Sequence, residues 1–102
     1  MEGDPLTHRR PLRRPGLVER ELPGELVLYD PQSDRAWLLN RTAAAVWDLA
    51  DGATPLAAIA AELTAALGVP AEQARQDVLE AVRHLAGEGV LVRGAGTEPG
   101  GG

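Results

Sequence analysis

The residues whose chemistry could be catalytic or metal-binding are few and poorly placed. Glu80, His84 and Glu88 recur at i, i+4 and i+8, so a helix would set them on one face, where they could hold a hydrated cation. The neighbouring apolar stripe points elsewhere, and a solvated face with ordinary ion pairs is the simpler interpretation. Ser33 and Thr42 have no histidine near in sequence to act as a base. The sequence therefore predicts no enzymatic activity, no metal and no cofactor.

Composition narrows the class of protein further. The 102 residues allow one domain, and an apolar content of 44% suffices for a small core. The chain has no cysteine and two histidines, which excludes a disulfide framework and a thiolate or imidazole-rich metal site. The longest apolar run, residues 56–61, is far shorter than the roughly 20 residues of a membrane span, and the N-terminus lacks a signal-peptide core. We expect a cytoplasmic protein.

Charge is unevenly distributed along the chain. Residues 1–20 carry a net charge of about +2 and residues 21–102 about −7, and there is no lysine. An acidic body repels phosphate backbones, so a nucleic-acid role would depend on the N-terminal arm alone. The pairs Arg9-Arg10 and Arg13-Arg14 in that arm are interpreted as a solvated extension, with a clamp for an acidic peptide or enzyme as the alternative.

Two tails and one domain are predicted. Residues 1–15 mix Pro, Gly, Asp and Arg without apolar periodicity, and residues 94–102 are Gly-rich. Both compositions are typical of disorder. The folded domain is therefore expected to span residues 16–93, between a disordered basic arm and a disordered tail.

Three antiparallel strands should begin the domain. A Pro23-Gly24 turn and a loop in which Asp30 can bond the following backbone separate short runs rich in Leu, Val and Tyr. The expected strands are residues 17–22, 25–29 and 35–39.

Three helices should follow the strands. Asn40 is a good N-cap for a helix over residues 41–50, Thr54 is expected to cap a second helix that ends at Gly68, and Pro70 opens the third. The third helix should end at residues 87–89, after which residues 90–92 dock on the core. Trp37 and Trp47 sit in apolar patterns and are predicted to fill the core.

Both faces of the second and third strands are apolar, whereas a sheet with one solvated face alternates with polar residues. Either helices and tails bury the sheet on both sides, or the second face meets a partner. The pattern alone favours the first interpretation. The third strand is also a candidate edge, and an unpaired edge can accept a peptide.

One run of residues carries a family resemblance. Residues 39–52 read Leu-Asn-x-Thr-Ala-x-x-Val-Trp-x-Leu-x-Asp-Gly, and Leu28-Tyr29-Asp30-Pro31 precedes them. With the helical remainder, this resembles the PqqD family, the peptide chaperones of pyrroloquinoline-quinone biosynthesis. Relatives of that family are the recognition domains of enzymes that modify ribosomally made peptides. The resemblance covers about residues 17–92.

The resemblance implies an α+β fold, namely a small winged-helix-like domain in which a three-stranded antiparallel sheet is followed by three helices. It implies that this domain has no enzymatic activity of its own. It also implies that the leader of a precursor peptide adds to the third strand, between that strand and the third helix. A modifying enzyme of the radical S-adenosylmethionine class is the implied second partner. Carried onto this sequence, the peptide-binding residues are Ala36, Trp37, Leu38, Leu39, Arg75, Val78, Leu79, Val82 and Arg83.

Two other functions stay open at the level of sequence. A winged-helix DNA-binding regulator has similar elements, but the third helix holds more carboxylates than arginines. An interaction module could instead dimerise through the same edge strand.

Overall fold

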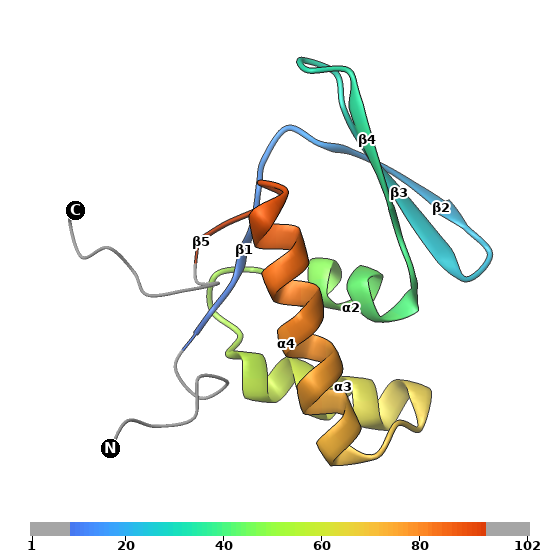
Figure 1. The fold of residues 1–102 in the computed structure, drawn as a ribbon, viewed down its shortest axis with the longest axis vertical. Helices are drawn as coiled ribbons and strands as arrows, with labels where there is room; N and C mark the ends of the chain where they lie inside the picture. The colour runs from blue at the N-terminus through green and yellow to red at the C-terminus, as the bar shows by residue number, and fades with distance from the viewer. Residues whose placement is uncertain (1–8, 94–102) are drawn as a thin grey trace.

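The computed structural model describes residues 9–93 (Figure 1). The sheet β2-β3-β4 is antiparallel, and three helices follow it, which confirms the predicted α+β, winged-helix-like architecture. In chain order the elements are β1 (Leu12–Arg13), β2 (Val18–Leu22), β3 (Glu25–Asp30), β4 (Arg35–Leu39), α2 (Arg41–Leu49), α3 (Leu56–Leu67), α4 (Ala71–Gly87) and β5 (Leu91–Arg93).

The loop between β3 and β4 is organised by one buried carboxylate. The Asp30 side chain accepts hydrogen bonds from the Gln32 backbone amide (2.9 Å) and the Ser33 hydroxyl (2.8 Å). The sequence predicted the first of these bonds, that to the following backbone. The Arg14 guanidinium donates to the same carboxylate at 3.0 Å. These bonds, that of Ser33 foremost, hold the pKa of Asp30 below its ordinary value. The loop thereby sets the direction in which β4 returns along β3.

The helices start and stop close to their predicted ends, with one correction. The Asn40 side chain caps α2 by accepting from the Ala43 amide at 2.9 Å, and Gly68 ends α3 in the left-handed conformation. Thr54 is not the cap of α3, because Pro55 occupies that position. The Thr54 hydroxyl instead donates to the Asp51 carboxylate, which stabilises the turn before the helix.

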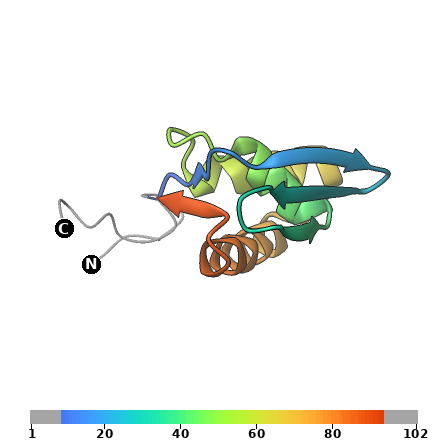
Figure 2. The same ribbon diagram turned by 90° about the horizontal axis from the view of Figure 1, so that it is seen from above.

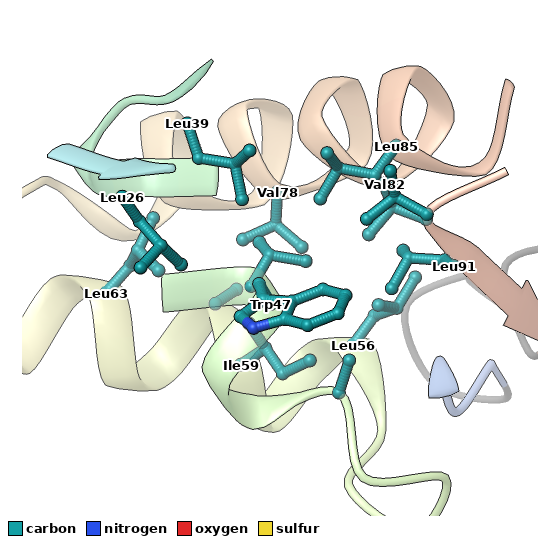
Figure 3. Close-up of a cluster of buried hydrophobic side chains, with 14 of the residues drawn as sticks. Leu26, Leu39, Trp47, Leu56, Ile59, Leu63, Val78, Val82, Leu85 and Leu91 are labelled. Carbon is teal, nitrogen blue, oxygen red and sulfur yellow. The ribbon is translucent and has the colours of Figure 1, made fainter. Parts of the chain in front are cut away.

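The core lies between the helices and the inner face of the sheet (Figure 3). Leu28, Val46 and Ile59 are fully buried there. Trp47 belongs to this core as predicted, and its indole N–H donates to the Glu19 carboxylate at 3.0 Å. Trp37 is only half-buried and packs against the edge of the core.

Residues 9–15, which the sequence assigned to a disordered arm, instead pack against the domain. β1 pairs with β5, and the Arg13 amide donates to the Ala50 carbonyl at 2.9 Å. The Arg13 guanidinium donates to the Asp48 carbonyl at 3.1 Å and lies over the Trp47 ring. The arm therefore satisfies carbonyl groups at the C-terminal end of α2, a role that leaves no apolar periodicity in the sequence. Residues 1–8 and 94–102, the remainder of the predicted tails, lie outside the described residues.

The outer face of the sheet is not buried, which corrects the favoured interpretation of its apolar pattern. Tyr29 is 37% exposed, Val18 48% and Leu38 62%, and these residues lie on the face opposite the buried Leu26 and Leu28.

Among residues 9–93 no helix is long and apolar enough to cross a membrane.

Candidate functional site

β4 forms one edge of the three-stranded sheet. β3 pairs with one side of it, in the register Val27 to Leu38 and Tyr29 to Ala36, and no other described strand pairs with the opposite side. Figure 2 shows β4 as the strand of this sheet that lies nearest α4. The outward N–H and C=O groups of β4 can therefore bond to a further strand.

A groove of about 480 Å³ follows this edge. Leu38 forms the wall on the β4 side, the start of α2 forms the base, and α4 forms the opposite wall. The groove is partly open to solvent. The lining residues are Leu38, Asn40, Thr42, Ala43, Asp77, Glu80, Ala81 and His84.

One carboxylate ties β4 to α4 beside the groove. Glu88, immediately after α4, accepts hydrogen bonds from the Arg35 guanidinium (2.8 Å) and the Trp37 indole N–H (3.1 Å). The Arg35 guanidinium also lies 5.0 Å from the centroid of the Trp37 ring. The bond from Trp37 first, and the charge of Arg35 after it, lower the pKa of Glu88. These contacts fix the distance between the two walls at the start of β4.

The four predicted residues of β4 divide between groove and core. Ala36 and Leu38 are exposed, and Leu38 lines the groove. Trp37 is half-buried, while Leu39 is buried in the core. The alternation follows from the pleat of the strand, which sends successive side chains to opposite faces.

The five predicted residues of α4 do not line this groove. Val78 and Val82 are buried in the core, and Leu79 is half-buried against it. Arg75 lines a separate small pocket with α3, and Arg83 is exposed elsewhere on the helix. These five residues came from the family resemblance, and the apolar ones among them face the core because the core is where α4 loses most apolar surface.

The residues that line the α4 wall were missed as binding residues. Asp77, Glu80, Ala81 and His84 recur at i, i+3, i+4 and i+7, which places them on one face of the helix. Glu80, His84 and Glu88 were recognised as sharing a face, but that face was interpreted as merely solvated. Its position beside β4 depends on how α4 crosses the sheet, which no local pattern encodes.

The groove combines acidic side chains with the backbone groups of an edge strand. Its α4 wall presents two carboxylates, those of Asp77 and Glu80, and the Asp77 carboxylate accepts from the Gln73 side chain at 2.9 Å. Among the described residues no group of three His, Asp or Glu side chains is placed to hold a metal ion. Backbone groups of an edge strand beside a partly apolar groove are the elements that recognise extended peptides.

Comparison with known proteins gives one family and two solved structures. The family model of "Coenzyme PQQ synthesis protein D (PqqD)" matches residues 25–91. A structure described as "Lasso peptide synthetase B1 complexed with the leader peptide" is 32% identical, with a TM-score of 0.66 over 81% of this chain and 98% of that one. A second, "TbiB1 in Complex with the TbiA(beta) Leader Peptide", is 20% identical, with a TM-score of 0.67 over 79% of this chain and 94% of that one. No curated protein matches the chain.

Proposed function

Because the chain belongs to the PqqD family, we propose that it is a non-catalytic carrier of a precursor peptide. The leader of that ribosomally synthesised peptide binds as a fourth strand along β4, and the carrier presents it to a modifying enzyme. The observation that supports this proposal most directly is the unpaired edge of β4 beside an open groove. Both similar structures are described as complexes with leader peptides.

The expected affinity is that of a carrier that releases its cargo. Burying roughly 300–400 Å² of apolar peptide surface contributes on the order of 8–10 kcal/mol, and each backbone hydrogen bond about 1 kcal/mol net. Ordering a flexible peptide removes several kcal/mol of this sum. The balance corresponds to a dissociation constant of roughly micromolar.

The chemistry belongs to a second partner in this proposal. By analogy with the family, that partner is a radical S-adenosylmethionine enzyme, which holds the iron and the cofactor. The acidic wall of the groove counts against the alternative of DNA binding, because it would face phosphate groups with carboxylates.

A nuclear magnetic resonance titration tests the proposal. Adding the leader of a precursor peptide encoded beside this gene should shift the backbone amides of β4 and of the α4 wall. The amides of β2, on the far edge of the same sheet, serve as the internal control. Shifts confined to β2 or to the chain ends would contradict the assignment of the site.

Light scattering separates peptide capture from self-pairing through the same edge. The proposal expects a monomer whose mass rises by one peptide on binding. A dimer that dissociates only when β4 is substituted would favour the interaction-module alternative instead.

A further inference from the structure

One wall of the groove is acidic and the other is apolar, and this difference determines which peptide side chains fit the groove. Resting on the proposed function, we infer that the recognised segment alternates basic and apolar side chains. Its Lys or Arg side chains point toward Asp77 and Glu80 on α4, and its apolar side chains lie beside Leu38 on the outer face of the sheet.

The alternation follows from strand geometry. A peptide that pairs with β4 sends successive side chains to the two faces of the sheet. On one face they continue the row of Arg35, Trp37 and Leu39, which points toward α4 and the core. On the other face they continue the row of Ala36 and Leu38, which solvent reaches. The two sets of peptide side chains therefore meet different surroundings.

The α4 wall extends along the whole of β4. Glu88 contacts Arg35 and Trp37 near the start of the strand, whereas Asp77 shares the groove with Asn40 just past its end. The helix thus runs opposite to the strand. Eleven residues of helix rise roughly 16 Å, and five residues of strand span about the same length. Each inward side chain of a paired peptide therefore passes this helix face.

The α4 wall of the groove is acidic, so a cationic side chain would complement its charge. Asp77 and Glu80 line the groove, while the arginines of α4, Arg75 and Arg83, do not. Arg35, the arginine of β4, already donates to Glu88. The wall therefore offers carboxylates without a neighbouring arginine in the groove, and an incoming anion would be repelled.

The shape of the wall fits long basic side chains. Ala81 lines the groove together with Glu80 and His84, and its small side chain leaves room for an alkyl stem. Lys and Arg bury such stems on apolar surface while their charged heads reach polar groups. An Asp or Ser side chain would be too short to fill this space and would carry no positive charge to pair with the carboxylates.

The outer face of the sheet is apolar around Leu38 and therefore favours apolar peptide side chains. Leu38 is 62% exposed, its cross-strand neighbour Val27 is half-buried, and Tyr29 beyond it is exposed. An apolar peptide side chain next to Leu38 removes apolar surface from water on both partners.

A selection from random peptides tests this inference. Displayed 12-residue peptides are selected on the full-length protein, and the backbone amide shifts of β4 identify the winners that bind its edge. Among these we expect Lys or Arg at the inward positions that pass Asp77 and Glu80, with apolar residues at the outward positions beside them. The Asp77→Asn/Glu80→Gln double variant should bind a labelled winner about three- to tenfold more weakly, because two partly exposed ion pairs are lost. The Glu62→Gln/Glu72→Gln variant removes two charges outside the groove and should bind within twofold of the wild type.

The possible results separate this inference from the proposed function. Winners that shift β4 but lack the basic alternation, or that bind the Asp77→Asn/Glu80→Gln variant unchanged, overturn the inference and leave peptide carriage standing. If no winner and no leader peptide shifts β4, both proposals fail. Alternation that is lost in winners selected on the double variant supports the inference.

Discussion

The sheet has two edges, β2 and β4, and they differ in the residues that border them. β2 reads Val-Glu-Arg-Glu-Leu and is exposed throughout, whereas β4 reads Arg-Ala-Trp-Leu-Leu and its last residue is buried. Charged side chains on an edge strand discourage pairing with another chain, and apolar ones favour it. The protein thus has one edge whose composition resists a further strand and one whose composition accepts it.

The surroundings of the two edges reinforce this difference. Beside β2, a hollow of about 320 Å³ lies between the sheet and α2. Its lining combines apolar residues with charged ones: Glu19, Glu21, Leu22, Gly24, Glu25, Leu26, Arg41, Ala44, Trp47 and Asp48. Glu19 is already engaged, because its carboxylate accepts the Trp47 indole N–H. Beside β4, the larger groove has Leu38 on one wall and a helix face on the other. Each edge thus has a helix beside it, α2 at β2 and α4 at β4, and the two edges differ in the charge of the strand itself and in the size of the adjoining hollow.

The largest expected effect concerns which face of α4 meets the β4 edge. Val78→Asp should unfold the domain, costing about 3–5 kcal/mol of unfolding free energy, because it places an unpaired carboxylate in the core. Urea denaturation followed by circular dichroism measures this loss. Glu80→Ala, on the groove face, should leave the unfolding free energy within about 1 kcal/mol. A stable Val78→Asp protein that merely fails to bind peptide would show that this residue faces the groove, as the sequence had suggested.

Substitutions on the two edge strands provide the sharpest comparison between them. Leu38→Asp on β4 should weaken leader binding by about 1–3 kcal/mol in a fluorescence anisotropy titration, because apolar contact beside the docked strand is lost. Leu22→Asp makes the same change at an exposed position of β2 and should leave the affinity unchanged. Leu38→Ser separates the loss of contact from the added charge. Equal losses from the β2 and β4 variants would remove the distinction drawn between the edges.

The smallest effect concerns the contact that holds β4 beside α4. The lowered pKa of Glu88 means that its bonds to Arg35 and Trp37 add stability above the ordinary carboxyl pKa of about 4.3. This contribution is lost as the pH falls through the lowered value. We expect the Trp37 indole N–H resonance to move over that acidic range, while the backbone amide of the fully buried Leu28 reports any general unfolding. In Glu88→Gln the Trp37 resonance should lose this dependence, and a retained dependence would assign it to another group.

Much of the fold could be read from local patterns in the sequence. The Pro23-Gly24 turn, the Asn40 cap and the Gly68 stop each act within a few residues, and the structure contains all three. The turn before α3 was misjudged because the Thr54 hydroxyl donates to the Asp51 carboxylate instead of accepting an amide from the first turn of the helix. The folded part of the arm was missed because its contacts are backbone bonds and arginine bonds to α2, which need no apolar repeat.

The candidate site could be predicted on its strand side and not on its helix side. Ala36 and Leu38 followed from the strand and its apolar character. Val78 and Val82 came from the family resemblance, but the structure buries both, and the residues of α4 at the groove are Asp77, Glu80, Ala81 and His84. A helix has one periodicity and several faces, and its sequence indicates which face is apolar without indicating what the polar face lies beside.

By itself the sequence determined the order of strands and helices, the acidic character of the body and the apolar composition of β4, because each depends on residues close together in the chain. Only the tertiary structure decided that β4 is left as an edge, that β1 pairs with β5 instead of belonging to a disordered arm, and that the polar face of α4 borders the groove. These features depend on the angle at which α4 crosses the sheet, and that angle is set by how core side chains from distant segments pack together.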